Sequence, residues 1–241
     1  MIRLGVTGTD TGVGKTVIAA SLIAALRQRG LRVAAMKPVE TGAITGPGDA
    51  TRLRAAAGDI DPLADVCPIS FPEPLAPLVA GQRSGRMIAL ETLDAAFARL
   101  SLGREAIVVE GAGGLLVPLT ERASYADLFA RWRLGTVVVA ANRLGALNHV
   151  RLTVQAARAA GLEIVAVVLN AATRPVADDL PAATNGRTLE RLLPDVPLVS
   201  WPWIPDPADD RALVASAEQS GLTALCAGAA ARRPELSLGT P

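Results

Sequence analysis

Cysteine, histidine and aromatic residues are scarce in this 241-residue chain, and their scarcity excludes several kinds of site. The two cysteines, Cys67 and Cys226, are too few for a zinc cluster and too far apart for a redox Cys-x-x-Cys pair. The single histidine, His149, has no candidate catalytic partner near it in the sequence. We therefore expect two buried thiols, and a hydrogen bond at a helix start for the histidine in place of a catalytic role.

An excess of charge of one sign and long apolar runs are also lacking. The chain has 24 basic and 23 acidic residues spread along its length, with a formal net charge of +1, so no surface for nucleic acid or an anionic membrane is indicated. No apolar run approaches the ~20 residues of a bilayer span, and no basic segment followed by an apolar core marks an export signal. We expect a cytoplasmic enzyme whose partners are small molecules.

Lysine is nearly absent, since 22 of the 24 basic residues are arginine and only Lys15 and Lys37 are lysine. Arginine replaces lysine readily on a solvated surface. It does so poorly where a compact, flexible ammonium must meet a phosphate or a reacting group. The two lysines are therefore the first candidates for chemistry.

Hydrophobic residues are plentiful, at 50% of the chain, and can form a substantial core. β-branched runs without polar alternation predict parallel strands covered on both faces, and alanine- and leucine-rich segments between them predict helices. We predict one α/β domain over residues 1–226, with a mostly parallel central sheet flanked by helices on both faces, and a flexible tail over residues 227–241. Residues 59–77, rich in proline, are expected to form a covering loop. The predicted strands span 2–6, 33–36, 106–109, 137–140, 164–169 and 197–200, and the predicted helices 16–29, 49–57, 88–100, 125–132, 149–160, 188–193 and 208–220.

A glycine-rich loop joins the first predicted strand to the first predicted helix and reads GTDTGVGKT from Gly8 to Thr16. Glycines allow backbone N–H groups to turn toward phosphate oxygens, and the helix N-terminus that follows favours negative charge. In such a loop Lys15 meets the β- and γ-phosphates, and the Thr16 hydroxyl binds Mg²⁺. Gly8 stands one residue before Thr9, where the pattern G-x-x-x-x-G-K-[ST] requires glycine. In its strand-to-helix context the loop still predicts a fold of the P-loop NTPase type and a protein that uses Mg-ATP.

A second motif, residues 37–42 (KPVETG), follows the second predicted strand. Ligands gather at the carboxyl ends of parallel strands in α/β sheets, so we expect Lys37 to face the phosphate loop. Its ammonium would neutralise charge that develops on a transferred phosphoryl group. The hydroxyl of Thr41 is a candidate to hold a substrate.

A third motif, residues 110–114 (EGAGG), follows the predicted strand over 106–109. It places Glu110 at the end of a strand, where P-loop proteins keep an acid that helps to hold Mg²⁺, and the glycines allow backbone to approach a triphosphate. Asp49 is a second candidate acid. It is an equally good N-cap for the helix that follows, and the spacing leaves both interpretations open.

These motifs, in this order, resemble the dethiobiotin synthetase family, whose members are ATP-dependent cyclo-ligases of biotin biosynthesis within the P-loop superfamily. The resemblance covers nearly the whole chain. It includes the shifted first glycine, which is a common feature of this family. Two positions depart from it, because members often carry Glu where this chain has Gly12, and some have Ser where it has Thr41. The matching segments are residues 8–16, 37–42, 110–114 and 144–149 (LGALNH).

The resemblance implies a role for each segment. Lys37 and Lys15 would be catalytic, with Lys37 beside the reacting groups, and Thr16, Asp49 and Glu110 would hold Mg²⁺ as the cofactor. The ATP site would comprise Gly12, Val13, Gly14, Lys15, Thr16, Val17, Asp49, Glu110, Gly111, Ala112 and Gly113, with Asn170, Ala171, Pro202, Trp203 and Ile204 around the adenine. The substrate site would comprise Thr11, Lys37, Thr41, Gly145, Ala146, Leu147 and Asn148. The last four would lie at a helix N-terminus that reaches the substrate carboxylate of a neighbouring subunit, so a homodimer is implied.

The implied reaction joins 7,8-diaminopelargonate, CO₂ and ATP. One amine captures CO₂ as a carbamate, ATP phosphorylates the carbamate, and the second amine attacks the mixed anhydride to close a cyclic urea. Orientation and neutralisation of charge would supply much of the rate, and no covalent nucleophile is needed.

Two other functions are compatible with the phosphate loop, and both occur in related proteins of the same superfamily. A cobyrinate-type amidotransferase would need a glutaminase half with a nucleophilic Cys and a partner His, and this chain is too short for one. A partitioning-type ATPase switch is the alternative from a different functional class. Such switches use a lysine early in the loop, where this chain has Asp10, and tend to present a basic or membrane-binding surface.

Overall fold

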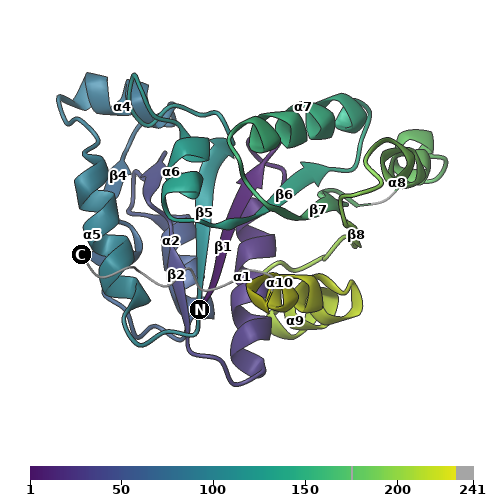
Figure 1. Cartoon of the computed structure of the whole chain (residues 1–241), viewed down its shortest axis with the longest axis horizontal. Coiled ribbons are helices and arrows are strands. Elements are labelled where there is room, and N and C mark those ends of the chain that lie inside the picture. Colours follow the sequence, from purple (N-terminus) through teal and green to yellow (C-terminus); the bar gives the residue numbers. More distant parts are fainter. Residues whose placement is uncertain (175, 232–241) are drawn as a thin grey trace, which may run out of the picture.

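Six parallel strands form the central sheet, in the order β2-β5-β1-β6-β7-β8 (Figure 1). The computed structural model describes residues 1–174 and 176–231. Because all strands run in the same direction, their carboxyl ends meet at one edge of the sheet, which for β1 and β5 is the upper edge in Figure 1. The strands are β1 (Ile2–Gly8), β2 (Val33–Met36), β5 (Ala106–Gly114), β6 (Gly135–Ala141), β7 (Ile164–Asn170) and β8 (Leu198–Trp201).

Both faces of this sheet are buried, which accounts for strands without polar alternation. Val108 of β5 packs into the hydrophobic core on one face, whereas its neighbours Ile107 and Val109 pack into the core on the other. In β6, Val137 and Val138 divide between opposite faces in the same way. The predicted α/β architecture, a parallel sheet covered on both sides, is confirmed.

Helices cover each face in one layer. On one face the central helix α1 packs against α2, α9 and α10, and in Figure 1 α9 and α10 lie beside it. The predicted burial of both thiols is confirmed, because Cys226 lies in the core of this face and Cys67 in the core of the other. The first face carries α1 (Lys15–Gln28), α2 (Gly48–Ala56), α9 (Asp210–Gln219) and α10 (Leu222–Ala231), and the second α5 (Leu90–Ser101), α6 (Tyr125–Arg131), α7 (Ala146–Ala159) and α8 (Leu180–Leu192).

A second, two-stranded parallel sheet pairs β3 (Val39–Thr41) with β4 (Ile69–Phe71). The prediction of a covering loop over residues 59–77 is therefore wrong. That stretch contains β4 and the short helix α3 (Leu63–Val66), and its last residue begins α4 (Pro77–Ser84). The apolar residues of β4 are buried in the core, and proline is compatible with the first position of a helix, so the prolines do not prevent regular structure.

Other predicted boundaries also shift. β5 continues through the glycines to Gly114, and α8 begins at Leu180, well before the predicted residue 188. The predicted tail boundary at residue 227 falls inside α10, which runs to Ala231 because its apolar residues pack on the core. Residues 232–241 of the predicted tail lie outside the described residues. In the described part of the chain, none of the helices combines the length and apolarity needed to cross a bilayer.

Candidate active site

The glycine-rich loop lies between β1 and α1 at the carboxyl edge of the sheet. Gly12 and Gly14 adopt φ values of 73° and 97°, which residues other than glycine rarely adopt. A Cβ on Gly14 would also lie 2.1 Å from the amide nitrogen of Asn170. That amide donates a hydrogen bond to the carbonyl of Val13 at 2.9 Å, and the N–H of Thr9 donates to the carbonyl of Val139 at 2.9 Å. The loop is therefore held from the sheet side by strands β6 and β7.

Lys15, the first residue of α1, is buried and folds back over this loop. Its Nζ donates to the carbonyl of Asp10 at 2.9 Å. Burial, and next the positive charge of Lys37, lower the pKa of Lys15 to about 8. The ammonium thus stands in a place that favours an incoming negative charge.

Lys37, which directly follows β2, is 3% exposed and lies between two carboxylates. Its Nζ donates to Glu110 Oε1 at 2.5 Å, to Asp49 Oδ2 at 3.1 Å and to the carbonyl of Gly111 at 3.3 Å. Thr16 donates its hydroxyl to the same Glu110 oxygen at 3.0 Å. The three predicted motifs therefore meet in one partly buried polar cluster, which we call the Lys37 cluster: Thr16, Lys37, Asp49 and Glu110.

Charge in the Lys37 cluster is set by burial and by the neighbours. Burial disfavours the ammonium of Lys37, but Glu110 and Asp49 outweigh it and raise the pKa of Lys37 above its usual range. Burial likewise disfavours the carboxylate of Asp49, and Lys37 outweighs it, so the pKa of Asp49 is lowered. For Glu110 burial dominates and raises the pKa. Lys37 therefore carries a stable positive charge at neutral pH.

The Lys37 cluster also offers oxygens that suit a Mg²⁺ ion. Glu110 Oε2 is buried and has no hydrogen-bond partner among the described residues, and such an orphaned oxygen fits a cation ligand. The described residues contain no group of three or more His, Cys, Asp or Glu side chains placed to hold a metal. Two carboxylates and a hydroxyl nevertheless fit Mg²⁺, which keeps several waters and is bound through one or two carboxylates plus substrate phosphates. Asp49 is not the N-cap of α2, because Pro47 occupies that position.

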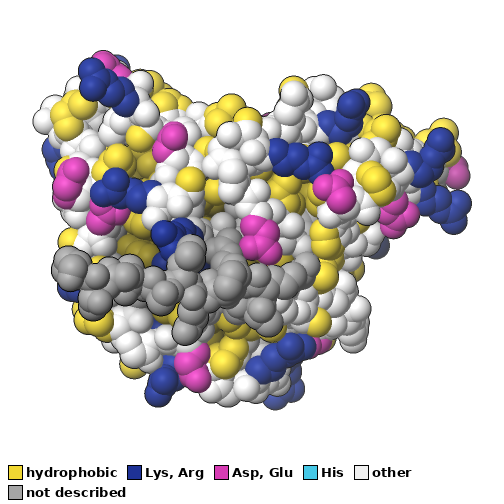
Figure 2. Space-filling view, in the orientation of Figure 1, with side chains coloured by type: hydrophobic (Ala, Val, Ile, Leu, Met, Phe, Trp, Pro, Cys, Tyr) yellow, Lys and Arg dark blue, Asp and Glu magenta, His cyan; other side chains and the backbone are white. Residues whose placement is uncertain are grey.

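A cavity of about 620 Å³ opens beside the Lys37 cluster. It lies between the glycine-rich loop and the start of α4, and Figure 2 shows the upper outline of the molecule hollowed between the regions of α4 and α7. Residues that the sequence did not assign to a site also line it, namely Glu40, Arg52, residues 74–77 and Val117. The predicted site residues that line it are Thr11, Gly12, Gly14, Lys15, Thr16, Val17, Lys37, Thr41, Asp49, Glu110, Ala112 and Gly113.

The residues predicted to surround adenine lie at the neighbouring strand ends. Asn170 ends β7 and pairs with Trp201 of β8, and the N–H of Ala171 donates to the carbonyl of Trp201 at 3.0 Å. This pairing brings Ala171 close to residues 202–204, although these lie outside the 620 Å³ cavity. Ala171 lines a second cavity of about 690 Å³, which shares Thr11 and Gly12 with the first.

The remaining predicted segment begins α7. Gly145 is the N-cap of this helix, with a φ of 93°, and Asn148 is exposed in its first turn. Arg143, two residues before Gly145, places a guanidinium nitrogen 4.0 Å from the Asp10 carboxylate, so this helix start lies next to the phosphate loop. Residues 145–148 line neither the 620 Å³ nor the 690 Å³ cavity.

Known proteins identify the family. A family model described as an AAA domain matches residues 3–206. The ATP-dependent dethiobiotin synthetase BioD of Anaeromyxobacter dehalogenans (strain 2CP-C) is 47% identical, over 86% of this chain and 92% of the relative. The chain belongs to the dethiobiotin synthetase family. The proteins of the same name from Aquifex aeolicus (strain VF5) and Xanthomonas axonopodis pv. citri (strain 306) are 39% and 42% identical, over 79% and 68% of this chain and 84% and 76% of the relatives.

Membership of this family confirms the resemblance inferred from the motifs. It makes the chain an ATP-dependent enzyme of biotin biosynthesis and decides against the partitioning-type switch. The geometry of the phosphate loop agrees with that assignment, since the loop, the two lysines and the carboxylates meet around one cavity.

Proposed function

We propose that this chain closes the ureido ring of dethiobiotin from 7,8-diaminopelargonate, CO₂ and ATP. The observation that carries the proposal is the buried ammonium of Lys37, held by Glu110 and Asp49 beside a cavity that Lys15 also lines. Two fixed positive charges facing one cavity suit a reaction in which a carbamate and a triphosphate must approach each other.

In the proposed reaction, one amine of the substrate adds to CO₂ and loses a proton, which leaves a carbamate. A carbamate oxygen attacks the γ-phosphorus of ATP, the bond from that phosphorus to the β,γ-bridging oxygen breaks, and ADP leaves. The second amine then attacks the carbamoyl carbon, the carbon–oxygen bond to phosphate breaks, and the amine proton is released with inorganic phosphate. The products are the cyclic urea, ADP and phosphate.

The residues of the site would share this work. Backbone N–H groups of the glycine-rich loop and Lys15 would hold the phosphates, and Lys37 would neutralise the carbamate and the transferred phosphoryl group. Thr16, Asp49 and Glu110 would hold Mg²⁺, which supplies charge neutralisation on the triphosphate when bound. Thr11 and Thr41 would orient the diamine. Gly111, with Asn170 and Ala171 and residues 202–204, would complete the nucleotide site.

We further propose a cytoplasmic homodimer in which residues 145–148 of one subunit bind the substrate carboxylate in the other. The exposed start of α7 and the exposed side chain of Leu144 support this part of the proposal. Mixing a Lys15→Ala variant with an Asn148→Ala variant tests it. Shared sites predict that mixed dimers regain activity that neither variant has alone, and no recovery under conditions where subunits exchange contradicts the shared site.

Product analysis tests the reaction itself. The full chain is incubated with Mg-ATP, ¹³C-bicarbonate and 7,8-diaminopelargonate, and mass spectrometry is expected to show a cyclic urea that carries one ¹³C, with one ADP for each urea. A substrate analogue with a single amine is the matched control, because it forms the carbamate but cannot close the ring. Equal ADP release with and without the diamine, and no labelled urea, would refute the proposal.

A further inference from the structure

Glu40 is a buried carboxylate that lines the 620 Å³ cavity and has no role in the proposed reaction. It lies in the middle of β3 and is 6% exposed. Its Oε1 accepts a hydrogen bond from the N–H of Asp49 at 3.0 Å, and its Oε2 accepts one from the N–H of Ala50 at 2.9 Å. Both oxygens are thus engaged by the first turn of α2.

This pair of hydrogen bonds supplies what the helix start itself lacks. The N-cap of α2 is Pro47, whose side chain has no hydrogen-bonding group, so the N–H groups of the first turn need another acceptor. A carboxylate is the best acceptor there, because the helix dipole favours negative charge at its N-terminus. Glu40 therefore caps α2 from a different element of the fold.

The segment between the two bonded ends is intrinsically flexible. Residues 41–48 contain three glycines, and Gly42 and Gly46 adopt φ values of 79° and 106°. Ile44, near the middle of the segment, is 80% exposed and adds little packing. Backbone N–H groups of Gly42 and Ala43 donate to the carbonyls of Glu73 and Phe71 and hold the start of the segment, so the hydrogen bonds of Glu40 are what fix its other end at α2. Glycine gains more conformational freedom than other residues when a constraint is removed, which makes that end sensitive to their loss.

The residue that this closure fixes is Asp49. Its N–H is bonded to Glu40 while its Oδ2 accepts from Lys37 at 3.1 Å. We propose that Glu40 is a positioning residue that sets the Asp49 carboxylate against Lys37 and thereby against the metal and triphosphate. Because Thr41 follows Glu40 on β3, the hydrogen bonds of Glu40 also connect the strand that carries Thr41 to the start of α2. This inference rests on the proposed function, since it assigns Asp49 to the Mg-ATP side of that site.

Two substitutions at Glu40 test the inference. Glu40→Ala removes both acceptors, and we expect the Mg²⁺ concentration for half-maximal activity to rise about 10-fold or more, as is typical for a partner of a metal ligand. Glu40→Gln keeps the shape and one acceptor oxygen but turns an NH₂ group toward the other N–H, so an intermediate rise is expected. An unchanged Mg²⁺ dependence in the Glu40→Gln variant would overturn the inference.

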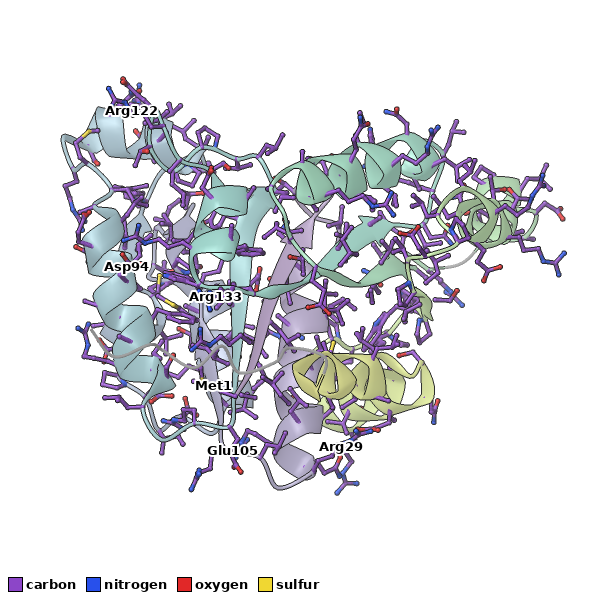
Figure 3. The ribbon with its side chains drawn as sticks, in the orientation of Figure 1. Met1, Arg29, Asp94, Glu105, Arg122 and Arg133 are labelled. Atoms are coloured by element: carbon purple, nitrogen blue, oxygen red, sulfur yellow. The ribbon has the colours of Figure 1, made fainter. Side chains whose placement is uncertain are left out.

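Glu105→Gln is the matched control. Glu105 also accepts a backbone N–H, that of Arg32 at 3.0 Å, but it is exposed and lies with Met1 at the opposite edge of the sheet (Figure 3). We expect its Mg²⁺ dependence to equal that of the wild type. Thermal melting of each variant separates loss of folded protein from loss of positioning.

A double-mutant cycle decides whether Glu40 acts through Asp49. In an Asp49→Asn background, we expect Glu40→Gln to have less than about a third of its effect in the wild-type background, because coupled residues are not additive. Fully additive effects would overturn the positioning role. Measuring the cycle by calorimetric binding of Mg-ATP, as well as by product formation, separates the two proposals. Wild-type protein that binds Mg-ATP without forming a urea contradicts the proposed reaction, while coupling between Glu40 and Asp49 in Mg-ATP binding would still support the positioning role.

Discussion

Strand β5 offers a direct comparison between the two edges of the sheet, because a glutamate stands near each. Glu105, just before the strand, pairs with Arg32 at 3.6 Å, and the two side chains are 45% and 69% exposed. Glu110, within the strand, pairs with Lys37 at 2.5 Å, and the two side chains are 1% and 3% exposed. An exposed pair contributes ~0–1 kcal/mol to stability, while burying two charges carries a desolvation penalty that offsets much of their attraction. Stability alone therefore does not explain the buried pair.

The identity of the cations follows the same division. Among the described residues, the ion pairs outside the Lys37 cluster all use arginine, and most of these are solvent-exposed. The two lysines of the chain are both buried and both line the 620 Å³ cavity. Lysine is kept at the edge where a compact ammonium faces the site, and arginine serves elsewhere.

Lys15→Ala should give the largest effect at the buried edge. We expect product formation to fall about 10³-fold, because a charged donor to the phosphates is lost. The fold should not be weakened at pH 7, since burial lowers the pKa of Lys15 and its charge therefore does not stabilise the ligand-free fold. Steady-state kinetics and thermal melting measure both quantities. Turnover near that of the wild type would refute the role of the loop.

Lys37→Arg sharpens the comparison of lysine with arginine. The guanidinium is larger than the ammonium and does not fit between Glu110 and Asp49 with the same contacts, so we expect kcat to fall about 100-fold. Arg32→Lys makes the reverse change in the exposed pair, and its kcat should stay within about twofold of the wild type. Equal effects of the two substitutions would remove the distinction between the edges.

The pH dependence of Mg-ATP binding tests the environment of Lys15. Its pKa is lowered from 10.5 to about 8 in the ligand-free protein, so above pH 8 binding of a triphosphate must be accompanied by uptake of a proton. Affinity should then fall up to about 10-fold for each pH unit above 8. Calorimetry in buffers of different ionisation enthalpy measures the proton uptake, and its absence at pH 8.5 would contradict the lowered pKa.

The lowered pKa of Lys15 also determines how this residue changes the stability of the fold with pH. The folded pKa of Lys15 lies below the unfolded value, so between pH 8 and 10.5 the unfolded chain binds more protons and this residue makes the fold more stable as pH rises. Lys15→Ala should remove that contribution from the pH profile of unfolding.

Arg32→Ala should give the smallest effect. It breaks the exposed pair with Glu105, and we expect the free energy of unfolding to change by less than ~1 kcal/mol, with product formation unchanged. Denaturant titration and the urea-forming assay measure the two. A loss of several kcal/mol would mean that the exposed edge is as strongly coupled as the buried one.

Much of the site could be predicted because its residues stand at strand ends, where local sequence and topology agree. Lys37 and Glu110 each directly follow a short apolar run, and parallel strands bring the ends of such runs together. The spacing left Asp49 between two interpretations. The structure favours its pairing with Lys37, because Pro47 takes the N-cap position.

Other parts depend on contacts that no local pattern encodes. β3 and β4 are short strands that form only because they pair with each other, so residues 69–71 were taken for part of a loop. Glu40 stands inside a motif that the sequence already indicated. Its role was missed because its hydrogen-bond partners lie across a glycine-rich segment.

The hydrogen bonds from Asn170 and Thr9 to neighbouring backbone mean that the phosphate loop is shaped before any nucleotide arrives. The conformational entropy of the loop is therefore lost during folding and does not weaken binding later. One partner is exchanged at the loop when the Lys15 ammonium leaves the carbonyl of Asp10 for a phosphate oxygen. Binding at this loop should accordingly resemble insertion into a rigid receptor.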